Sequence, residues 1–166
     1  MNRCVLSRLF EHNNWANNLV MDACSKLSDA QLDAQPQSAT KGSIRETLSH
    51  FVRAQQNYLR DITRVEPPFT WETPPALEKM RESLTLSGQG FLEIASDEAG
   101  RLPKSRVQTR DGSQVEPWVI MLQAVNHATK HREQINSMLT ALGLTPLDMD
   151  GWSYAEVTGA IAPPLI

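Results

Sequence analysis

The sequence predicts an all-α protein built as a four-helix bundle, with a short β-hairpin before its last long helix. The main evidence is four long segments in which apolar residues recur at alternating spacings of three and four, as in a helix that buries one face. One Asp-Gly turn signal between short alternating segments indicates a pair of strands. Four such apolar stripes are buried most simply when four helices pack against one another.

The first helix is predicted over roughly residues 3–26. Its stripe contains small or polar residues at Asn13 and Ala16, which favour close packing of a neighbouring helix. The full stripe is Leu6, Leu9, Asn13, Ala16, Val20, Ala23 and Leu27. A capping box at Ser28-Asp29-Ala30-Gln31 predicts one short helical turn, followed by a polar loop over residues 35–42.

The second helix is predicted from about residue 43 to 65. Ser43 and Glu46 form another capping box at its start, and Pro67-Pro68 ends it. Its stripe is Ile44, Leu48, Phe51, Gln55, Leu59 and Ile62. The helix is therefore expected to bury one face while His50 lies at the edge of that face.

The third helix is predicted to follow Thr73-Pro74-Pro75, with Thr73 as N-cap and the prolines in the first turn, and to end near Ser96. Its Gly88 and Gly90 favour close packing. The hairpin is then expected around Asp111-Gly112.

The fourth helix is predicted over residues 117–142, with Gly143 as its C-cap. The tail, residues 147–166, is expected to pack as a short turn or helix around Trp152 and Tyr154. Because the connections before the second and fourth helices are long, crossovers are expected there.

Composition narrows the classes of function. The chain of 166 residues is long enough for one domain, residues 1–166, and its 40% hydrophobic content is ordinary for a globular protein. A net charge of −3 provides no broad basic field, which argues against nucleic acid as a direct ligand. We found no signal-peptide pattern and no long uncharged apolar segment, so a cytoplasmic protein without a membrane partner is expected.

The cysteines predict reduced thiols. Cys4 and Cys24 both fall in the first predicted helix, where twenty residues at the helical rise place them roughly 30 Å apart. That distance is far beyond the reach of a disulfide bond, so two free thiols of a reducing compartment are expected.

The histidines suggest a metal site. His127 and His131 are four residues apart and therefore project from one face of the fourth helix. With His50 from the second helix they could supply three neutral nitrogens and leave a fourth coordination position open, the arrangement of catalytic zinc sites. The alternative is that all three are ordinary histidines bonded to their neighbours.

Several enzyme classes lack support. In zinc proteases of the His-Glu-x-x-His type the residue after the first histidine is the general base, whereas here it is Ala128. The sequence also has no glycine-rich phosphate loop and no nucleophile elbow, so it gives no support for ATP use or serine hydrolysis.

The sequence resembles the DinB family of small helical metalloproteins over nearly its whole length. The resemblance lies in Ser49-His50-Phe51, in His127-Ala128-Thr129-Lys130-His131 and the residues up to Gly143, in Trp15-Ala16-Asn17, in Asp111-Gly112 before Pro117, and in Pro146, Asp148 and Trp152. It implies an up-up-down-down bundle, a divalent metal ion such as zinc or nickel on His50, His127 and His131, and frequently a homodimer. It departs from the family at Glu133, where many relatives carry Gly, and at His12, where an aromatic residue is common.

The resemblance also implies kinship with thiol-dependent enzymes, mycothiol-dependent maleylpyruvate isomerase and bacillithiol transferases. The first hypothesis is therefore a transferase that uses a low-molecular-weight thiol as substrate at the metal. Metal-dependent hydrolysis is the second, and a non-catalytic, stress-related metal-binding bundle is the third. Catalytic residues are not assigned; Gln134, Asn126 and Glu46 are candidates for orienting ligands, and Arg132 is expected to form a structural ion pair.

Overall fold

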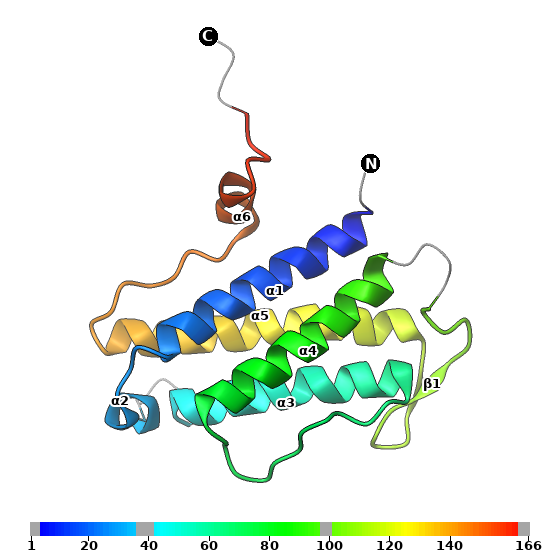
Figure 1. Ribbon diagram of the computed structural model, residues 1–166, viewed down its shortest axis with the longest axis horizontal. Coiled ribbons are helices and arrows are strands. Elements are labelled where there is room, and N and C mark those ends of the chain that lie inside the picture. Colours follow the sequence, from blue (N-terminus) through cyan, green and yellow to red (C-terminus); the bar gives the residue numbers. More distant parts are fainter. Residues whose placement is uncertain (1–3, 36–41, 97–100, 163–166) are drawn as a thin grey trace.

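The structure, a computed structural model, describes residues 4–35, 42–96 and 101–162. In this part of the chain four long helices form a bundle, accompanied by shorter helices and a hairpin (Figure 1). The elements are α1 (Val5–Cys24), α2 (Asp29–Asp33), α3 (Ile44–Thr63), α4 (Leu77–Ser96), β1 (Val107–Gln108), β2 (Gln114–Val115), α5 (Pro117–Ala141) and α6 (Gly151–Val157). The all-α bundle with a hairpin before its last long helix is confirmed, while most of the predicted loop over 35–42 and the last four residues of the tail lie outside the described residues.

Local sequence signals account for most of the helix boundaries. Ser28 and Ser43 each accept a hydrogen bond from the third residue of the following helix, and both capping boxes are complete. Gly143 has φ 79°, the left-handed conformation that ends α5. Thr73 is not an N-cap, because α4 begins only at Leu77. A residue followed by proline is disfavoured in the helical region, so the two prolines precede the helix.

The hairpin forms where it was predicted. Val107 pairs with Val115, and Gln108 pairs with Gln114, in antiparallel register. Gly112 in the turn has φ 90°, which a glycine adopts without steric cost.

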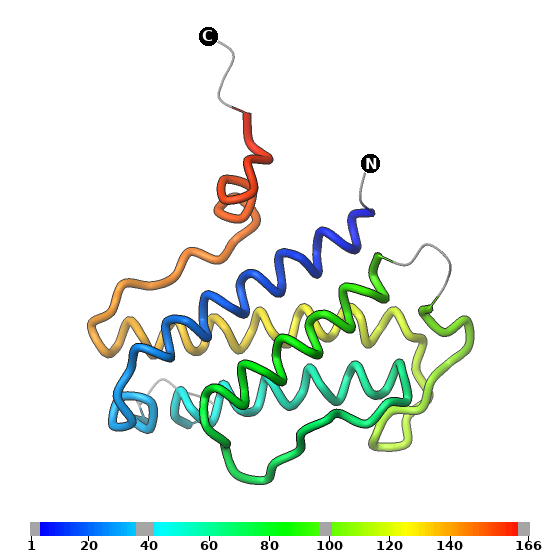
Figure 2. The backbone as a smooth tube through the Cα atoms, viewed as in Figure 1, coloured from blue at the N-terminus to red at the C-terminus, as the bar shows by residue number. Residues whose placement is uncertain are grey.

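The directions of the helices differ from the expected order. α1 is antiparallel to α4, α3 is parallel to α4, and α3 is antiparallel to α5, so the order is up-down-down-up rather than up-up-down-down (Figure 2). Two contacts for each pair of helices establish these directions. They are Phe10–Phe91 and Asp22–Arg81 for α1 and α4, Gln55–Leu84 and Leu59–Gly90 for α3 and α4, and His50–His127 and Tyr58–Gln123 for α3 and α5. The crossover is therefore residues 64–76, between α3 and α4, and not in the connections before α3 and α5 (Figure 1). A stripe determines which face a helix buries but not which neighbour covers it.

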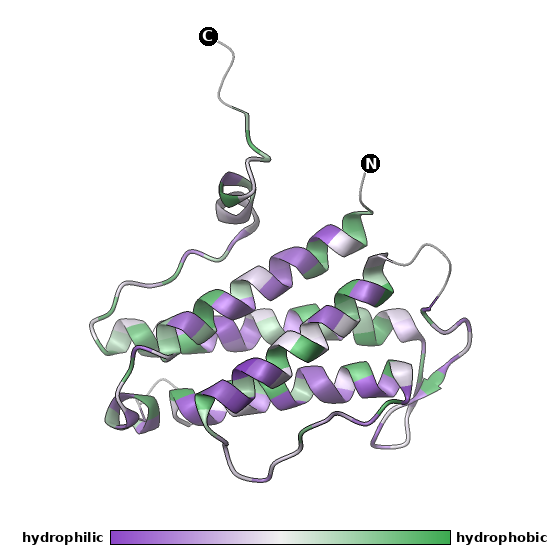
Figure 3. Ribbon diagram, in the orientation of Figure 1, coloured by the Kyte–Doolittle hydropathy of each residue, from purple (hydrophilic) through white to green (hydrophobic). Residues whose placement is uncertain are grey.

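The core consists of apolar faces that meet inside the bundle. Figure 3 shows apolar and polar residues sharing every long helix, as the stripes predict. Phe10 and Phe91 stack in parallel with ring centroids 5.2 Å apart. An added Cβ atom would lie 2.6 Å from Asn14 at Gly88 and 2.5 Å from Leu59 at Gly90, so these glycines permit the close approach of α1 and α3 to α4.

A chain of buried polar side chains joins the four long helices. Arg132 of α5 is 2% exposed, and its Nη1 donates to Oδ1 of Asn13 at 2.8 Å and of Asn17 at 2.6 Å, both on α1. Asn17 Nδ2 donates to Oε1 of Gln55 on α3 at 3.1 Å, and Gln55 Nε2 donates to Oγ of Ser87 on α4 at 2.9 Å. In the described residues no buried side-chain nitrogen or oxygen lacks a hydrogen bond, so these polar groups are accommodated in the core.

The tail lies on α1 through aromatic contacts. The ring of Tyr154 on α6 lies 5.4 Å from that of His12 and 5.2 Å from that of Trp15, measured between centroids. α6 itself extends away from the rest of the bundle, and Trp152 is 74% exposed (Figure 1). The short helix is thus confirmed, and Tyr154 packs as expected, whereas Trp152 does not pack against the bundle. In the part of the chain that the structure describes, no helix is both long and apolar enough to cross a bilayer.

Candidate metal centre

Three histidines from two helices meet between α3 and α5. His50 lies two turns into α3, and His127 and His131 lie one turn apart on the face of α5 that packs against it. The capping box at Ser43 fixes where α3 starts, and the four-residue spacing on α5 aligns its two rings. The structure thus brings together the three residues singled out from the sequence.

Two of the distances between the ring nitrogens match those of a tetrahedral metal site. Nε2 of His127 lies 3.1 Å from Nε2 of His50 and 3.2 Å from Nε2 of His131, and ligand atoms of all three lie within 4.8 Å of one another. Two nitrogens bound tetrahedrally to zinc at the usual bond length are about 3.3 Å apart. The three imidazoles therefore lie in positions from which they could hold one metal ion.

Gln134 sets the orientation of one of these rings. Its Oε1 lies 2.6 Å from Nδ1 of His131, so that nitrogen donates the hydrogen bond and Nε2 presents a lone pair. The Nε2 atom of a neutral His127 carries at most one proton, and that proton can form a hydrogen bond with the Nε2 atom of His50 or of His131 but not with both. A cation would satisfy all three nitrogens at once, so the donor set fits a metal ion better than a hydrogen-bonded cluster.

The centre is sealed on one side only. His131 is 1% exposed, whereas His50 and His127 are half-buried. The ring of Tyr58 stands edge-on to that of His127, with centroids 5.7 Å apart. An ion held there would be anchored from the interior and reachable from the side of the less buried histidines.

The fourth histidine has a different role. Nε2 of His12 lies 2.9 Å from the carbonyl oxygen of Met149, and its ring contacts those of Trp15 and Tyr154. His12 therefore helps to fasten the tail to α1, and it does not join the three-histidine cluster.

The other candidate residues differ in whether they contact the histidine cluster. Gln134 contacts a ring of the cluster, but Asn126 is exposed, and Glu46 accepts a hydrogen bond from the backbone of Ser43 in its capping box. The expected ion pair of Arg132 is absent from the described residues, because its partners are the neutral oxygens of Asn13, Asn17 and Thr129. Burial lowers the pKa of Arg132 to about 10, and the charge of Glu133 partly offsets this.

Tyr58 was not identified from the sequence. It lies eight residues after His50, so both project from similar faces of α3. The eight-residue spacing could have suggested that Tyr58 lies near the site, but only if the packing of α5 against this face of α3 were already known.

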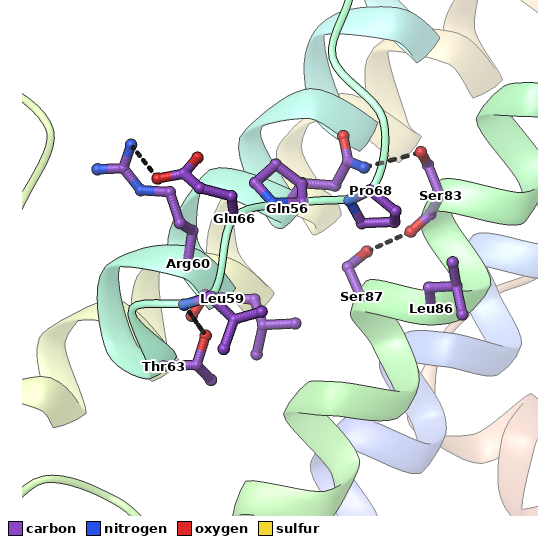
Figure 4. A pocket seen from close by; sticks show the side chains of 11 residues that line it. Gln56, Leu59, Arg60, Thr63, Glu66, Pro68, Ser83, Leu86 and Ser87 are labelled. Atoms are coloured by element: carbon purple, nitrogen blue, oxygen red, sulfur yellow. Dashed lines mark hydrogen bonds and ion pairs between the residues drawn. The ribbon is translucent and has the colours of Figure 1, made fainter.

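A separate cavity lies on the other side of α3, against α4 and the crossover. It measures about 180 Å³, and the polar side chains that line it are Gln56, Arg60, Thr63, Glu66, Ser83 and Ser87 (Figure 4). Gln56 Nε2 donates to Oγ of Ser83 at 2.8 Å. None of the three histidines lines this cavity, so it is not an extension of the metal centre.

Comparison with known proteins bears on the family and the fold of this chain. The family model described as "DinB family" matches residues 1–164. A crystal structure of a protein from Exiguobacterium sibiricum 255-15, provisionally assigned to the same family, is similar with a TM-score of 0.67 and 20% sequence identity, and the similarity covers 90% of this chain and 100% of that one. At this identity the likeness concerns the fold. No curated protein matches the chain.

Proposed function

The chain belongs to the DinB family, and on that premise we propose that it is a metal-dependent enzyme formed by one domain, residues 1–166. His50, His127 and His131 are the proposed ligands of a single divalent ion, zinc or nickel. The observation that supports this most strongly is the convergence of three Nε2 atoms at 3.1 and 3.2 Å from helices that are distant in sequence. Neutral imidazoles suit both metals.

The reaction that we propose is transfer of a low-molecular-weight thiol to an electrophile. When bound, the ion would supply a Lewis-acidic position that lowers the pKa of a thiol. The protein contributes the rest: His131 is held by Gln134, and a guest molecule would approach the ion from the side of His50 and His127, which are only half-buried. Support for the thiol comes from family resemblance and not from a contact in the structure.

A direct test uses the purified chain with bacillithiol, mycothiol or glutathione and a model electrophile such as monochlorobimane. Thiol consumption should depend on the metal and should be lost in the His127→Ala variant. The matched control is His12→Ala, which removes a histidine outside the cluster. Absence of turnover with all three thiols would contradict the transferase proposal.

Hydrolysis is the second candidate, because the same open side of the cluster would admit water in place of a thiol. Hydrolysis of ester or amide substrates without any thiol, lost with the metal, would support it. A non-catalytic, stress-related metal-binding bundle is the third, and a fourth protein ligand closing the site would favour it.

We also propose that the protein acts as a homodimer. Several apolar side chains on α1 and on the first turns of α5 are exposed, among them Leu9 at 40%, Trp118 at 59% and Leu122 at 50%. These side chains lie on two helices that pack against each other, and exposed apolar side chains that gather on one face are a feature of protein interfaces. Analytical ultracentrifugation of the wild type and of Trp118→Ser would test this, because a dimer held by this surface should dissociate in the variant.

A further inference from the structure

The cavity between α3, α4 and the crossover, called the crossover cavity below, has a mainly apolar surface. Leu59 of α3 and Leu86 of α4 form two of its walls. Val65 and Pro67-Pro68 of the crossover form a third wall. Most of the surface that faces the cavity is therefore carbon, although several of the lining residues are polar.

The uncharged polar side chains of the lining are engaged in hydrogen bonds (Figure 4). Nε2 of Gln56 donates to Oγ of Ser83 at 2.8 Å, and Oγ of Ser87 donates to the carbonyl oxygen of Ser83 at 2.7 Å. Oγ1 of Thr63 donates to the carbonyl oxygen of Leu59 at 3.0 Å. A ligand that needs hydrogen bonds would have to compete with these existing ones.

The charged side chains of the lining balance each other. Nη1 of Arg60 lies 3.9 Å from Oε1 of Glu66, and its Nη2 donates to Oδ1 of Asp61 at 3.0 Å. The lining therefore carries one cation and one anion that are paired with each other, and it presents no net charge that would attract an ion.

The crossover is fastened beside the cavity. Nε1 of Trp71 donates to Oγ of Ser49 on α3 at 2.8 Å, and the ammonium of Lys79 on α4 lies 3.0 Å from the ring centroid of Phe69. The rings of Pro67-Pro68 fix the backbone angle φ in the wall itself. A wall held in this way keeps the hollow preformed, as ligand sites usually are.

The size of the crossover cavity suits one ring. It measures about 180 Å³, whereas an apolar cavity of about 150 Å³ in another protein holds a benzene molecule. Two lining residues are accessible from outside, since Val65 is 69% exposed and Leu86 is 49% exposed. A small molecule can therefore enter from solvent at this side.

We propose that the crossover cavity is a binding site for a small, uncharged, apolar molecule of about the size of one aromatic ring. Its ring lies against Leu59, Val65 and Leu86, and burial of its apolar surface supplies the binding free energy. The inference goes beyond the proposed function and does not depend on it, since none of the three histidines lines the cavity.

The test is an NMR titration of the full-length chain, as purified, with toluene as the probe. The methyl signals of Leu59, Val65 and Leu86 should shift together and saturate. The methyl signals of Leu144, an exposed leucine outside the cavity, should stay in place.

Two variants place a carboxylate in the walls. Leu86→Asp and Val65→Asp should each bind toluene about tenfold or more weakly, because the bound ring would strip water from a charge. The matched control is Leu144→Asp, which should bind as the wild type does. Circular dichroism checks the fold of each variant, and Val65 lies outside the helices, so its replacement leaves their backbone hydrogen bonds intact.

Two charged analogues test the chemistry of the ligand. Benzoate and benzylamine carry the same ring with a negative or a positive charge, and each should bind about tenfold or more weakly than toluene. The inference is overturned if the toluene shifts map elsewhere, if either folded wall variant binds toluene as tightly as the wild type, or if either charged compound binds more tightly than toluene.

Discussion

Oε1 of Gln134 lies 2.6 Å from Nδ1 of His131, three residues earlier on α5. This contact orients the imidazole of His131, the most deeply buried of the three. Because His131 is only 1% exposed, the surrounding side chains leave its ring little other freedom. An acceptor in this position fixes the tautomer that binds a metal through Nε2.

Replacing Gln134 should therefore weaken metal binding without unfolding the protein. For Gln134→Ala we expect an affinity for zinc about 10- to 100-fold lower, as is typical when the partner of a metal-binding histidine is removed. Competition with a chromophoric chelator measures it. Glu133→Ala, at the neighbouring exposed position, is the control, and equal affinities of the two variants would argue against this role.

The buried arginine gives a second prediction. Arg132→Met leaves the side-chain oxygens of Asn13 and Asn17 without their charged donor in the core. We expect the free energy of unfolding to fall by about 2–6 kcal/mol, because each of the two stranded buried acceptors costs about 1–3 kcal/mol. Urea denaturation measures it, with Lys130→Met at an exposed site as control. An unchanged midpoint would mean that the polar chain through the core contributes nothing.

Burial of Cys24 predicts a dependence of stability on pH. Desolvation raises the pKa of this thiol from 9.0 to about 12 in the folded state. The unfolded chain therefore ionises first, so the contribution of Cys24 is complete below pH 9 and is lost as the pH rises toward 12. Within this window the free energy of unfolding should fall more steeply in the wild type than in Cys24→Ala, by about 1.4 kcal/mol per pH unit.

Cys4→Ala is the matched control for that measurement, because Cys4 is exposed. Its slope should equal that of the wild type. If Cys24→Ala also kept the wild-type slope, the thiol would have to be accessible to solvent in the folded protein.

The capping box of α3 allows a fourth prediction. Oγ of Ser43 accepts from the amide of Glu46, and the carboxylate of Glu46 accepts from the amide of Ser43. Ser43→Ala should lower the free energy of unfolding by about 1 kcal/mol. Thermal unfolding measures it, with the exposed Ser137→Ala as control. A loss no greater than that of the control would show that the cap does not stabilise the helix that carries His50.

The sequence predicted local features well. Helix extents follow from apolar spacing, and the capping boxes and the glycine turn depend on neighbours a few residues apart. The histidine cluster was also predicted. The spacing of His127 and His131 is local, the predicted bundle allowed His50 of the second helix to meet them, and the family resemblance implied the same three residues.

Features that depend on which helices are neighbours could not be predicted. The order of helix directions, the crossover at residues 64–76 and the contact of Tyr58 with His127 all arise from packing between distant segments. The ion pair expected for Arg132 was wrong for the same reason. Its adjacent acid, Glu133, is exposed, whereas the partners of Arg132 come from α1, more than a hundred residues away.

The most direct test of the central claim is metal analysis of the protein purified without a histidine tag. The wild type should carry about one zinc or nickel ion per chain, and His50→Ala, His127→Ala and His131→Ala should each lose it while remaining folded by circular dichroism. His12→Ala should retain the full amount. A wild type without metal, or undiminished metal in the three cluster variants, would contradict the assignment of these histidines as ligands.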